Sequence, residues 1–155
     1  MNKEAPWMDW MSARLGWNET KNDKALAKYW KYTTYTAGIK DQTVRGKKYA
    51  WCAMTINAAL FESGYKGNRS AAAKSFINFG LECKPKLGAI IVMRHVGGGH
   101  HVTFFKSWFD EKKKIAYCLG GNQGNSLKVS MYDLSGNKKG HDEIVACRWP
   151  DNLLT

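Results

Sequence analysis

The sequence predicts an α+β fold in which N-terminal helices pack on a C-terminal antiparallel β-sheet. Residues 1–80 carry apolar side chains at helical spacing, whereas residues 88–150 hold apolar runs of strand length. Turn-forming residues separate these runs, and helices followed by consecutive strands are typical of this fold class. Because the chain has 155 residues and no internal repeat, we expect a single domain over residues 1–155.

Two helices are predicted before residue 37. The first spans 6–15 and begins at Pro6, since proline is favoured at the first helical position. The second spans 22–36, opens on the capping residues Asn22 and Asp23, and is helical at least to Tyr32. The polar stretch 37–48 that follows is predicted to be a loop.

Two further helices are predicted before the strands begin. The apolar segment 52–63 forms the third helix, which Gly64 ends. The fourth spans 68–80, with Asn68 or Ser70 as its cap and Gly80 at its end. Five strands complete the chain, at 88–94, 100–109, 114–120, 126–134 and 143–150.

The charge balance favours polyanionic partners. Twenty-four Lys and Arg against 13 Asp and Glu leave a net charge of +11, which suits nucleic acid, anionic membranes or acidic cell-wall polymers. The lysines are scattered and form no compact basic helix, which disfavours nucleic acid. No apolar run is long enough to insert in a membrane, and the N-terminus lacks signal-peptide features. We therefore expect synthesis in the cytoplasm without a signal peptide.

The four cysteines are predicted to be free thiols. Cys52, Cys83, Cys118 and Cys147 form no CxxC and no paired metal-ligand spacing, so neither a metal nor another cofactor is expected. Cys118 and Cys147 stand in apolar, strand-like segments, where a cysteine is typically a core residue. A disulfide between these two stays open if the protein reaches an oxidising space.

Cys52 is different, because it begins a predicted helix directly after a tryptophan. It is either a buried apolar residue or a nucleophile whose thiolate the helix N-terminus stabilises. A nucleophile needs a nearby base, for which the chain offers His95, His100, His101 and His141. Because His100 and His101 are adjacent on a predicted strand, only one of them can face the helix that carries Cys52.

Several motifs taken together resemble one enzyme group. They are "PWM" with "ARLG" after it, "YW" at 29–30, "WCAMTINAAL", "SAAAKSFINFG", "PKLGAIIV", "HVTFF" and "LGGNQGN". In this order they are similar to the papain-like peptidoglycan hydrolases of the NlpC/P60 and CHAP superfamily, and more closely to a small group of cell-wall amidases or peptidases found in phage and bacterial genomes. The similarity covers nearly the whole chain and implies a papain-like NlpC/P60 fold.

The resemblance also assigns roles to residues. It implies that Cys52 is the nucleophile, that His101 is the base, and that Asn122 orients the imidazole, with Gln123 one step along the chain as the competitor. The chain departs from the family pattern in two places. It has Gly88-Ala89 where Gly-Asp is common, and His100-His101-Val102 where Gly-His-Val is common; the residue before the valine matches best, which favours His101.

The resemblance finally implies a function. It predicts a cysteine hydrolase that cleaves an amide bond in the stem peptide or cross-bridge of peptidoglycan. Such an enzyme acts in the periplasm or cell wall, either as a phage lysis enzyme or as a secreted antibacterial effector, and an effector is expected to have an immunity protein as partner. The alternatives are a metal-dependent enzyme and a basic nucleic-acid- or wall-binding module without catalysis.

Overall fold

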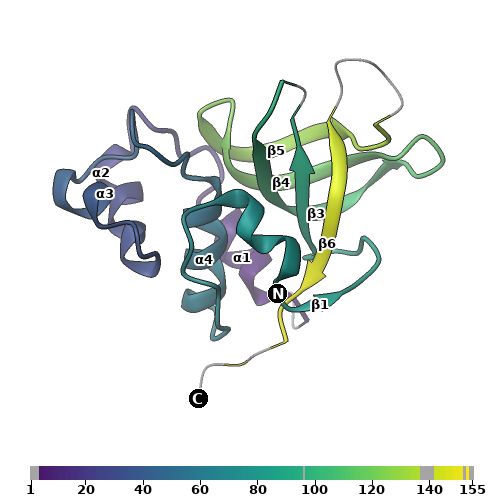
Figure 1. Ribbon diagram of the computed structural model, residues 1–155, viewed down its shortest axis with the longest axis horizontal. Coiled ribbons are helices and arrows are strands. Elements are labelled where there is room, and N and C mark those ends of the chain that lie inside the picture. Colours follow the sequence, from purple (N-terminus) through teal and green to yellow (C-terminus); the bar gives the residue numbers. More distant parts are fainter. Residues whose placement is uncertain (1–3, 96, 137–141, 152, 154–155) are drawn as a thin grey trace.

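Helices occupy the first half of the chain and an antiparallel six-stranded sheet the second, as the sequence predicts for an α+β fold (Figure 1). The structure is a computed structural model that describes residues 4–95, 97–136, 142–151 and 153. The helices are α1 (Pro6–Ser12), α2 (Asp23–Ala27), the 3₁₀ helix η1 (Lys28–Tyr32), α3 (Thr36–Asp41), α4 (Cys52–Glu62) and the 3₁₀ helix η2 (Ala73–Asn78).

Two helix predictions need correction. The stretch 37–48 is not a loop throughout, because α3 covers its first residues. The segment 68–80 forms only the short η2, and neither Asn68 nor Ser70 caps it, since its N-cap is Ala72. The side chains of Asn68 and Ser70 instead accept hydrogen bonds from backbone N–H groups two residues ahead, which favours a turn over a helix.

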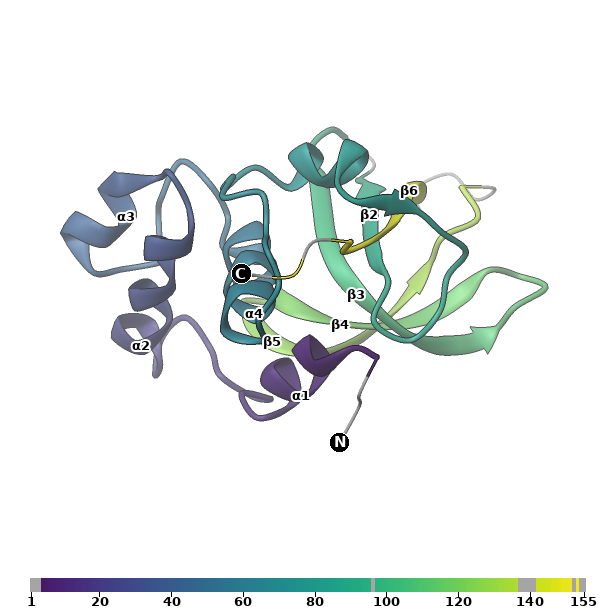
Figure 2. The same ribbon diagram turned by 90° about the horizontal axis from the view of Figure 1, so that it is seen from below.

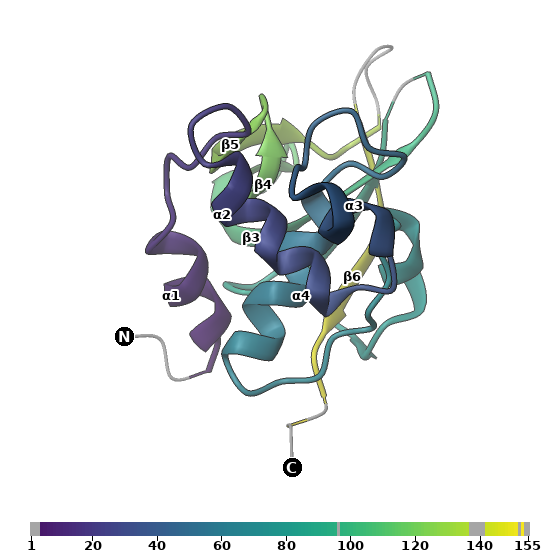
Figure 3. The same cartoon turned by 90° about the vertical axis from the view of Figure 1, so that its left-hand side faces the viewer.

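Helix α4 is the central helix of the fold. Every residue from Cys52 to Leu60 is buried, so this helix is covered on all sides. The curved sheet lies against one side of it, while α2 and α3 lie beyond its other side (Figures 2 and 3). Within the described residues, no helix has both the length and the apolar character needed to cross a membrane.

The sheet has the strand order β1-β6-β2-β3-β4-β5, and every neighbouring pair is antiparallel. Its strands are β1 (Leu81–Glu82), β2 (Ile90–Arg94), β3 (His100–Asp110), β4 (Ile115–Gln123), β5 (Ser126–Asp133) and β6 (Glu143–Trp149). Five of them match the predicted strands. The sixth, β1, is too short to leave a pattern in the sequence.

The two faces of the sheet bury different sets of side chains. Val102 and Phe104 of β3 belong to the apolar cluster that contains Cys52 and the rest of α4. Phe105 belongs to a second cluster on the opposite face, with Met93 and Cys118. From His100 to Phe105, the alternation along β3 therefore places residues of even number toward α4 and residues of odd number away from it. The register shifts beyond Phe105 end this pattern, and Trp108 packs on the second cluster.

A β-bulge interrupts β4 close to α4. Gly120 pairs with Lys128 and Gln123 with Ser126, so Gly121 and Asn122 together stand opposite one residue of β5. Asn122 has a φ of 56°, in the left-handed region that asparagine tolerates better than most residues. Because of this extra residue, the side chains of β4 after the bulge lie on the face opposite to the one that regular alternation predicts.

Gly121 allows α4 to approach the sheet closely. A Cβ atom at this position would lie 2.5 Å from Thr55 Oγ1 and 2.8 Å from the Trp51 ring. These contacts are shorter than side chains tolerate, and both come from the first turn of α4 or its N-cap. The absence of a side chain at Gly121 thus sets the distance between β4 and the start of α4.

We expect Gly121→Ala to lower the free energy of unfolding by about 1–3 kcal/mol, the usual cost of overpacking a core. Chemical denaturation followed by tryptophan fluorescence measures this change. Asn122→Gly is the control, because glycine accepts the positive φ of this position, and it should stay within about 1 kcal/mol of the original protein. Equal stability of Gly121→Ala and the original protein would contradict this account of the packing.

Candidate active site

Cys52 is the first residue of α4, and the residue is only 3% exposed. The N-cap, Trp51, supplies no side-chain hydrogen bond to the first turn, so the N–H groups there lack a capping partner. Burial raises the pKa of the Cys52 thiol, whereas hydrogen bonds from the backbone of Val102, Ala53 and Cys52 itself lower it. The helix start therefore directs N–H donors at the sulfur.

The contact with Val102 shows where the thiol lies relative to the sheet. Phe105 directs its backbone N–H and C=O toward Ala89 and Gly88, on the β2 side of β3. Since these directions alternate along a strand, Val102 directs its N–H toward β4. The register of β3 with β4 begins only at Phe104, which leaves that N–H to the sulfur. Cys52 thus meets β3 from the α4 side of the sheet, at the gap between β3 and β4.

His101 is 4% exposed and hydrogen-bonded to the side chain of Gln123. The distance from His101 Nε2 to Gln123 Oε1 is 3.1 Å. The orientation of the Gln123 amide is fixed, because its Nε2 donates to the carbonyl oxygens of Cys118 at 3.1 Å and Lys128 at 2.8 Å. Its Oε1 can only accept, so the neutral imidazole carries its proton on Nε2 and keeps the lone pair on Nδ1.

Other rings and one carboxylate surround His101. The His95 ring is stacked on it with centroids 5.7 Å apart, and the Tyr132 ring lies at 5.9 Å. His95 Nδ1 is in turn 2.9 Å from Asp142 Oδ1. The pKa of His101 is lowered to about 4, mainly by burial and to a smaller extent by His95, although Gln123 and Asp142 act in the opposite direction. His101 is therefore neutral at physiological pH.

The prediction that Asn122 orients His101 needs correction, because the residue that bonds the ring is Gln123. In a regular strand Asn122 would share the face of Cys118 and Gly120, which is the face of His101. The bulge at Gly121 and Asn122 moves Gln123 to that face instead. The Gly-Gly-Asn sequence is a signal that could have indicated a bulge, since glycine and asparagine are residues that accept positive φ.

The sequence also predicts that the catalytic histidine shares the face of β3 that points at α4, and this expectation is wrong for His101. The side chains of Val102 and Phe104 lie on the face of β3 that points at α4. By alternation, His100 lies on the same face and His101 on the opposite one. The Cys52 sulfur nonetheless lies beside the backbone of Val102, the residue directly after His101. Burial is the main cause of the raised pKa of Tyr132, whose ring is packed near His101, and the Cys52 thiol makes a smaller contribution in the same direction. The thiol and the imidazole thus approach the β3–β4 gap from opposite faces.

Among the described contacts, no hydrogen bond joins the Cys52 sulfur to an imidazole. Catalytic hydrogen bonds are often long before substrate binds, so this geometry is compatible with the predicted pair. The three described histidines have different surroundings. His100 lines the pocket at the thiol, and His95 is hydrogen-bonded to Asp142. Of the three, only His101 is hydrogen-bonded to a side-chain amide. The fourth candidate, His141, lies outside the described residues.

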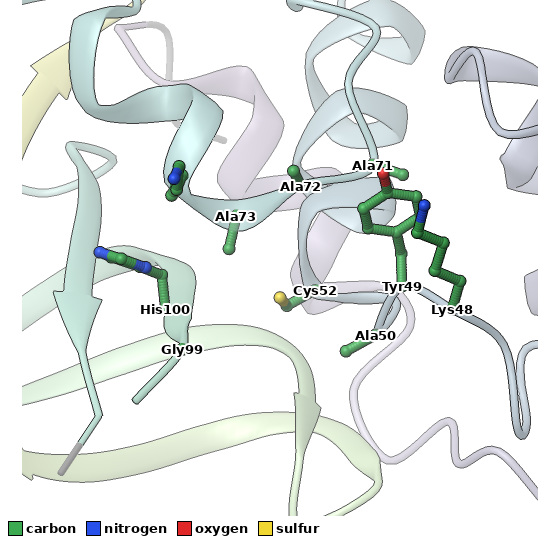
Figure 4. Close-up of a pocket in the computed structure, with 10 residues that line it drawn as sticks. Lys48, Tyr49, Ala50, Cys52, Ala71, Ala72, Ala73, Gly99 and His100 are labelled. Carbon is green, nitrogen blue, oxygen red and sulfur yellow. The ribbon is translucent and has the colours of Figure 1, made fainter. Parts of the chain in front are cut away.

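A surface pocket of about 310 Å³ leads to Cys52. Figure 4 shows the sulfur directed into the space bordered by Ala73, His100 and Tyr49. A neighbouring pocket of about 290 Å³ shares the lining residues Lys48, Tyr49 and Ala71 and extends toward Thr34 and Tyr35. Lys48 and Lys74 are the charged residues that line the first pocket, so its charge is positive.

The alanine wall of this pocket is held by a buried asparagine of α4. Asn57 donates to Ser70 O at 2.9 Å and accepts from Arg69 N at 3.0 Å. These bonds fix the segment immediately before Ala71–Ala73, which forms the wall opposite the sheet. The helix that carries the thiol therefore also positions one side of the pocket.

Comparisons with protein-family models, with curated proteins and with solved structures found no significant match to this chain. Within the described residues, no group of three or more His, Cys, Asp or Glu side chains is placed to hold a metal ion.

The lowered pKa of His101 predicts a pH-dependent stability. The imidazole of His101 is protonated at about pH 4 in the folded state and near pH 6.5 in the unfolded chain. The neutral imidazole therefore makes its full contribution to the free energy of unfolding above pH 6.5. This contribution is lost as the pH falls through 4. The difference between the folded and unfolded pKa values of His101 corresponds to about 3 kcal/mol of stability. Urea unfolding near pH 7 and near pH 4 should show a smaller loss for His101→Gln than for the original protein. An equal loss in both would contradict the buried, neutral imidazole.

Proposed function

We propose that this protein is a cysteine hydrolase with a papain-like NlpC/P60 fold that cleaves an amide bond in the stem peptide or cross-bridge of peptidoglycan. The observation that carries the proposal is the bond from His101 Nε2 to Gln123 Oε1, in a fold that also places the Cys52 thiol at a helix N-terminus. This bond leaves Nδ1 as the basic nitrogen of His101. A base held in one tautomer near a thiol is what nucleophilic catalysis requires.

The first step forms a thioester. His101 Nδ1 takes the proton of the Cys52 thiol as the sulfur attacks the carbonyl carbon of the amide. The carbonyl oxygen becomes an oxyanion, and the backbone N–H groups of Cys52 and Ala53 at the helix start are its donors. His101 then gives its proton to the leaving amine, and the C–N bond breaks. The acyl group remains on the sulfur.

The second step releases the acyl group. Neutral His101 takes a proton from a water molecule, whose oxygen attacks the thioester carbonyl. The C–S bond breaks, the free acid leaves, and the proton returns to the Cys52 sulfur. Each turnover therefore consumes one water molecule and regenerates both the thiol and the neutral imidazole.

Burial keeps both partners uncharged before substrate binds. It raises the pKa of the Cys52 thiol and lowers the pKa of His101, so the resting pair is thiol and imidazole, not thiolate and imidazolium. The charges then form only as the sulfur attacks. Gln123 Oε1 and the nearby Asp142 carboxylate favour the imidazolium at that moment, since both raise the pKa of His101.

The charge of the protein suits a peptidoglycan substrate. The wall carries many carboxylates, and the net charge of +11 raises the local concentration of enzyme there. Lys48 and Lys74 bring positive charge to the pocket at the thiol. Under this proposal the protein acts in the periplasm or cell wall, as a phage lysis enzyme or as a secreted antibacterial effector. In the second case an immunity protein would cover this pocket.

One observation favours the alternative of a binding module without catalysis. Lys21, Lys24, Lys28 and Arg45 line a surface pocket of about 570 Å³ at α2, away from Cys52. Only one carboxylate, Asp23, lines it with them, and that group is paired with Arg45 at 3.2 Å. A surplus of cations suits a polyanion, either a wall polymer or a nucleic acid.

The hydrolase proposal predicts that Cys52→Ala abolishes digestion of purified peptidoglycan. Mass spectrometry of the released fragments checks this and identifies the bond that is cleaved. Cys52→Ser should also be inactive, because a hydroxyl has a far higher pKa than a thiol. Lytic activity of Cys52→Ala with unchanged circular dichroism would end the proposal, and salt-sensitive binding without any digestion by the original protein would favour the binding module.

Gln123→Ala should reduce kcat/KM by at least about tenfold and by as much as the roughly 10²–10⁴-fold that general acid–base catalysis contributes. The reason is that the imidazole loses the acceptor that fixes its tautomer. Asn122→Gly, one residue away and on the bulge, is the matched control and should keep most of the activity. The decisive reading is the pH dependence of kcat/KM, because loss of the Gln123 oxygen changes the pKa of His101 whereas lost stability alone does not.

A further inference from the structure

Cys83 and Cys147 lie opposite each other on neighbouring segments of chain. The antiparallel register of β1 with β6 pairs Leu81 with Trp149 and Glu82 with Arg148, and its next step pairs the two cysteines. The backbone N–H of Cys83 donates to Cys147 O at 3.1 Å, which confirms that step. Their sulfur atoms are 3.5 Å apart. Both thiols are free and half-buried.

This geometry is close to that of a disulfide. Directly opposed residues of antiparallel strands have Cα atoms roughly 4.5–5.5 Å apart, within the range of about 4.4–6.8 Å that disulfides span. The sulfur atoms need only approach from 3.5 Å to about 2.05 Å, which rotation of the side chains can supply. The backbone of the two segments is already in place.

Cys118 is not the partner of Cys147 in this structure. The sequence leaves a Cys118–Cys147 disulfide open, but β2 and β3 lie between the strands of these two residues. Cys118 is fully buried, and its burial raises the pKa of its thiol to about 12. Within the described residues, the sulfur–sulfur contact of Cys147 is with Cys83.

We propose that Cys83 and Cys147 form a disulfide when the protein meets a disulfide donor, such as oxidised glutathione or a protein dithiol oxidase. In the first exchange, the Cys83 sulfur loses its proton and attacks the donor disulfide, and one donor thiolate leaves. In the second, the Cys147 sulfur loses its proton and attacks the Cys83 sulfur, and the second donor thiolate leaves. The two cysteines are oxidised by two electrons, and the donor is reduced to two thiols.

The cross-link would fasten the segment that carries the pocket wall. This segment runs from Ala71 through η2 to Cys83, and β6 holds its end through two hydrogen bonds from Arg148, to Phe79 O at 2.7 Å and Gly80 O at 3.3 Å. The disulfide adds a covalent bond at the same place. It joins residues 64 positions apart in the chain, and closing a loop of this length restricts the unfolded state strongly.

The test compares the full chain incubated with oxidised glutathione and with reduced glutathione. Intact mass should fall by two hydrogen atoms in the oxidised sample, and a non-reducing peptide map should join the peptides that contain Cys83 and Cys147. The thermal midpoint should be higher in the oxidised sample by roughly 5 °C or more. These readouts require no enzymatic activity, so they stand apart from the test of the proposed hydrolase.

Three variants make the outcome specific. Cys83→Ser and Cys147→Ser should each lose both the mass change and the increase in thermal midpoint, whereas Cys118→Ser should keep both. A map that links Cys118 to Cys147 would overturn the proposal, as would a protein that takes up glutathione as a stable adduct without forming the internal bond. An unchanged mass of the original protein under the same donor would overturn it as well.

Discussion

The bulge of β4 at Gly121 and Asn122 is the constraint on which the rest of the site depends. Before the bulge, β4 pairs with β3 from Ile115 to Leu119 with two shifts of register, and Gly121 then lets the first turn of α4 approach the strand. After the bulge, Gln123 has changed face and reaches His101. Because pairing between β3 and β4 has ended there, the Val102 N–H is left for the Cys52 sulfur. The bulge thus helps to place the Cys52 thiol and brings the Gln123 side chain to His101.

The hydrogen bonds of Gln123 explain how so polar a group is buried at this point. Its amide oxygen accepts from His101 and from Thr103 Oγ1 at 2.6 Å, while its amide nitrogen donates to two backbone carbonyls. All the donor and acceptor sites of the amide are therefore used, which offsets the cost of removing it from water. Gly120 leaves room for this cluster, since a Cβ there would lie 2.4 Å from Thr103 Oγ1. The two consecutive glycines thus allow close packing on opposite faces of β4, Gly120 against Thr103 and Gly121 against α4.

Much of this arrangement was predictable from the sequence, and the errors have physical causes. The helix that begins at Cys52 and the strands are encoded in long apolar runs, and their bounds are close to those predicted. The residue that bonds the His101 ring was not predictable by alternation, because alternation assumes a regular strand and the bulge breaks it. Helix α3 and the short η2 depend on contacts with the rest of the fold more than on local pattern. Strand β1 exists only because β6 pairs with it.

The site also depends on the docking of two layers of the fold. Cys52 belongs to the helical layer and its apolar cluster, whereas His101 and Gln123 project from the opposite face of the sheet. Neither layer holds both groups, so the proposed catalytic pair would form only where α4 meets the gap between β3 and β4. Local opening of that contact would separate the thiol from the imidazole while leaving each layer hydrogen-bonded. Under the proposed function, the close packing of Trp51 and Thr55 on Gly121 would therefore serve the chemistry as well as the stability of the fold.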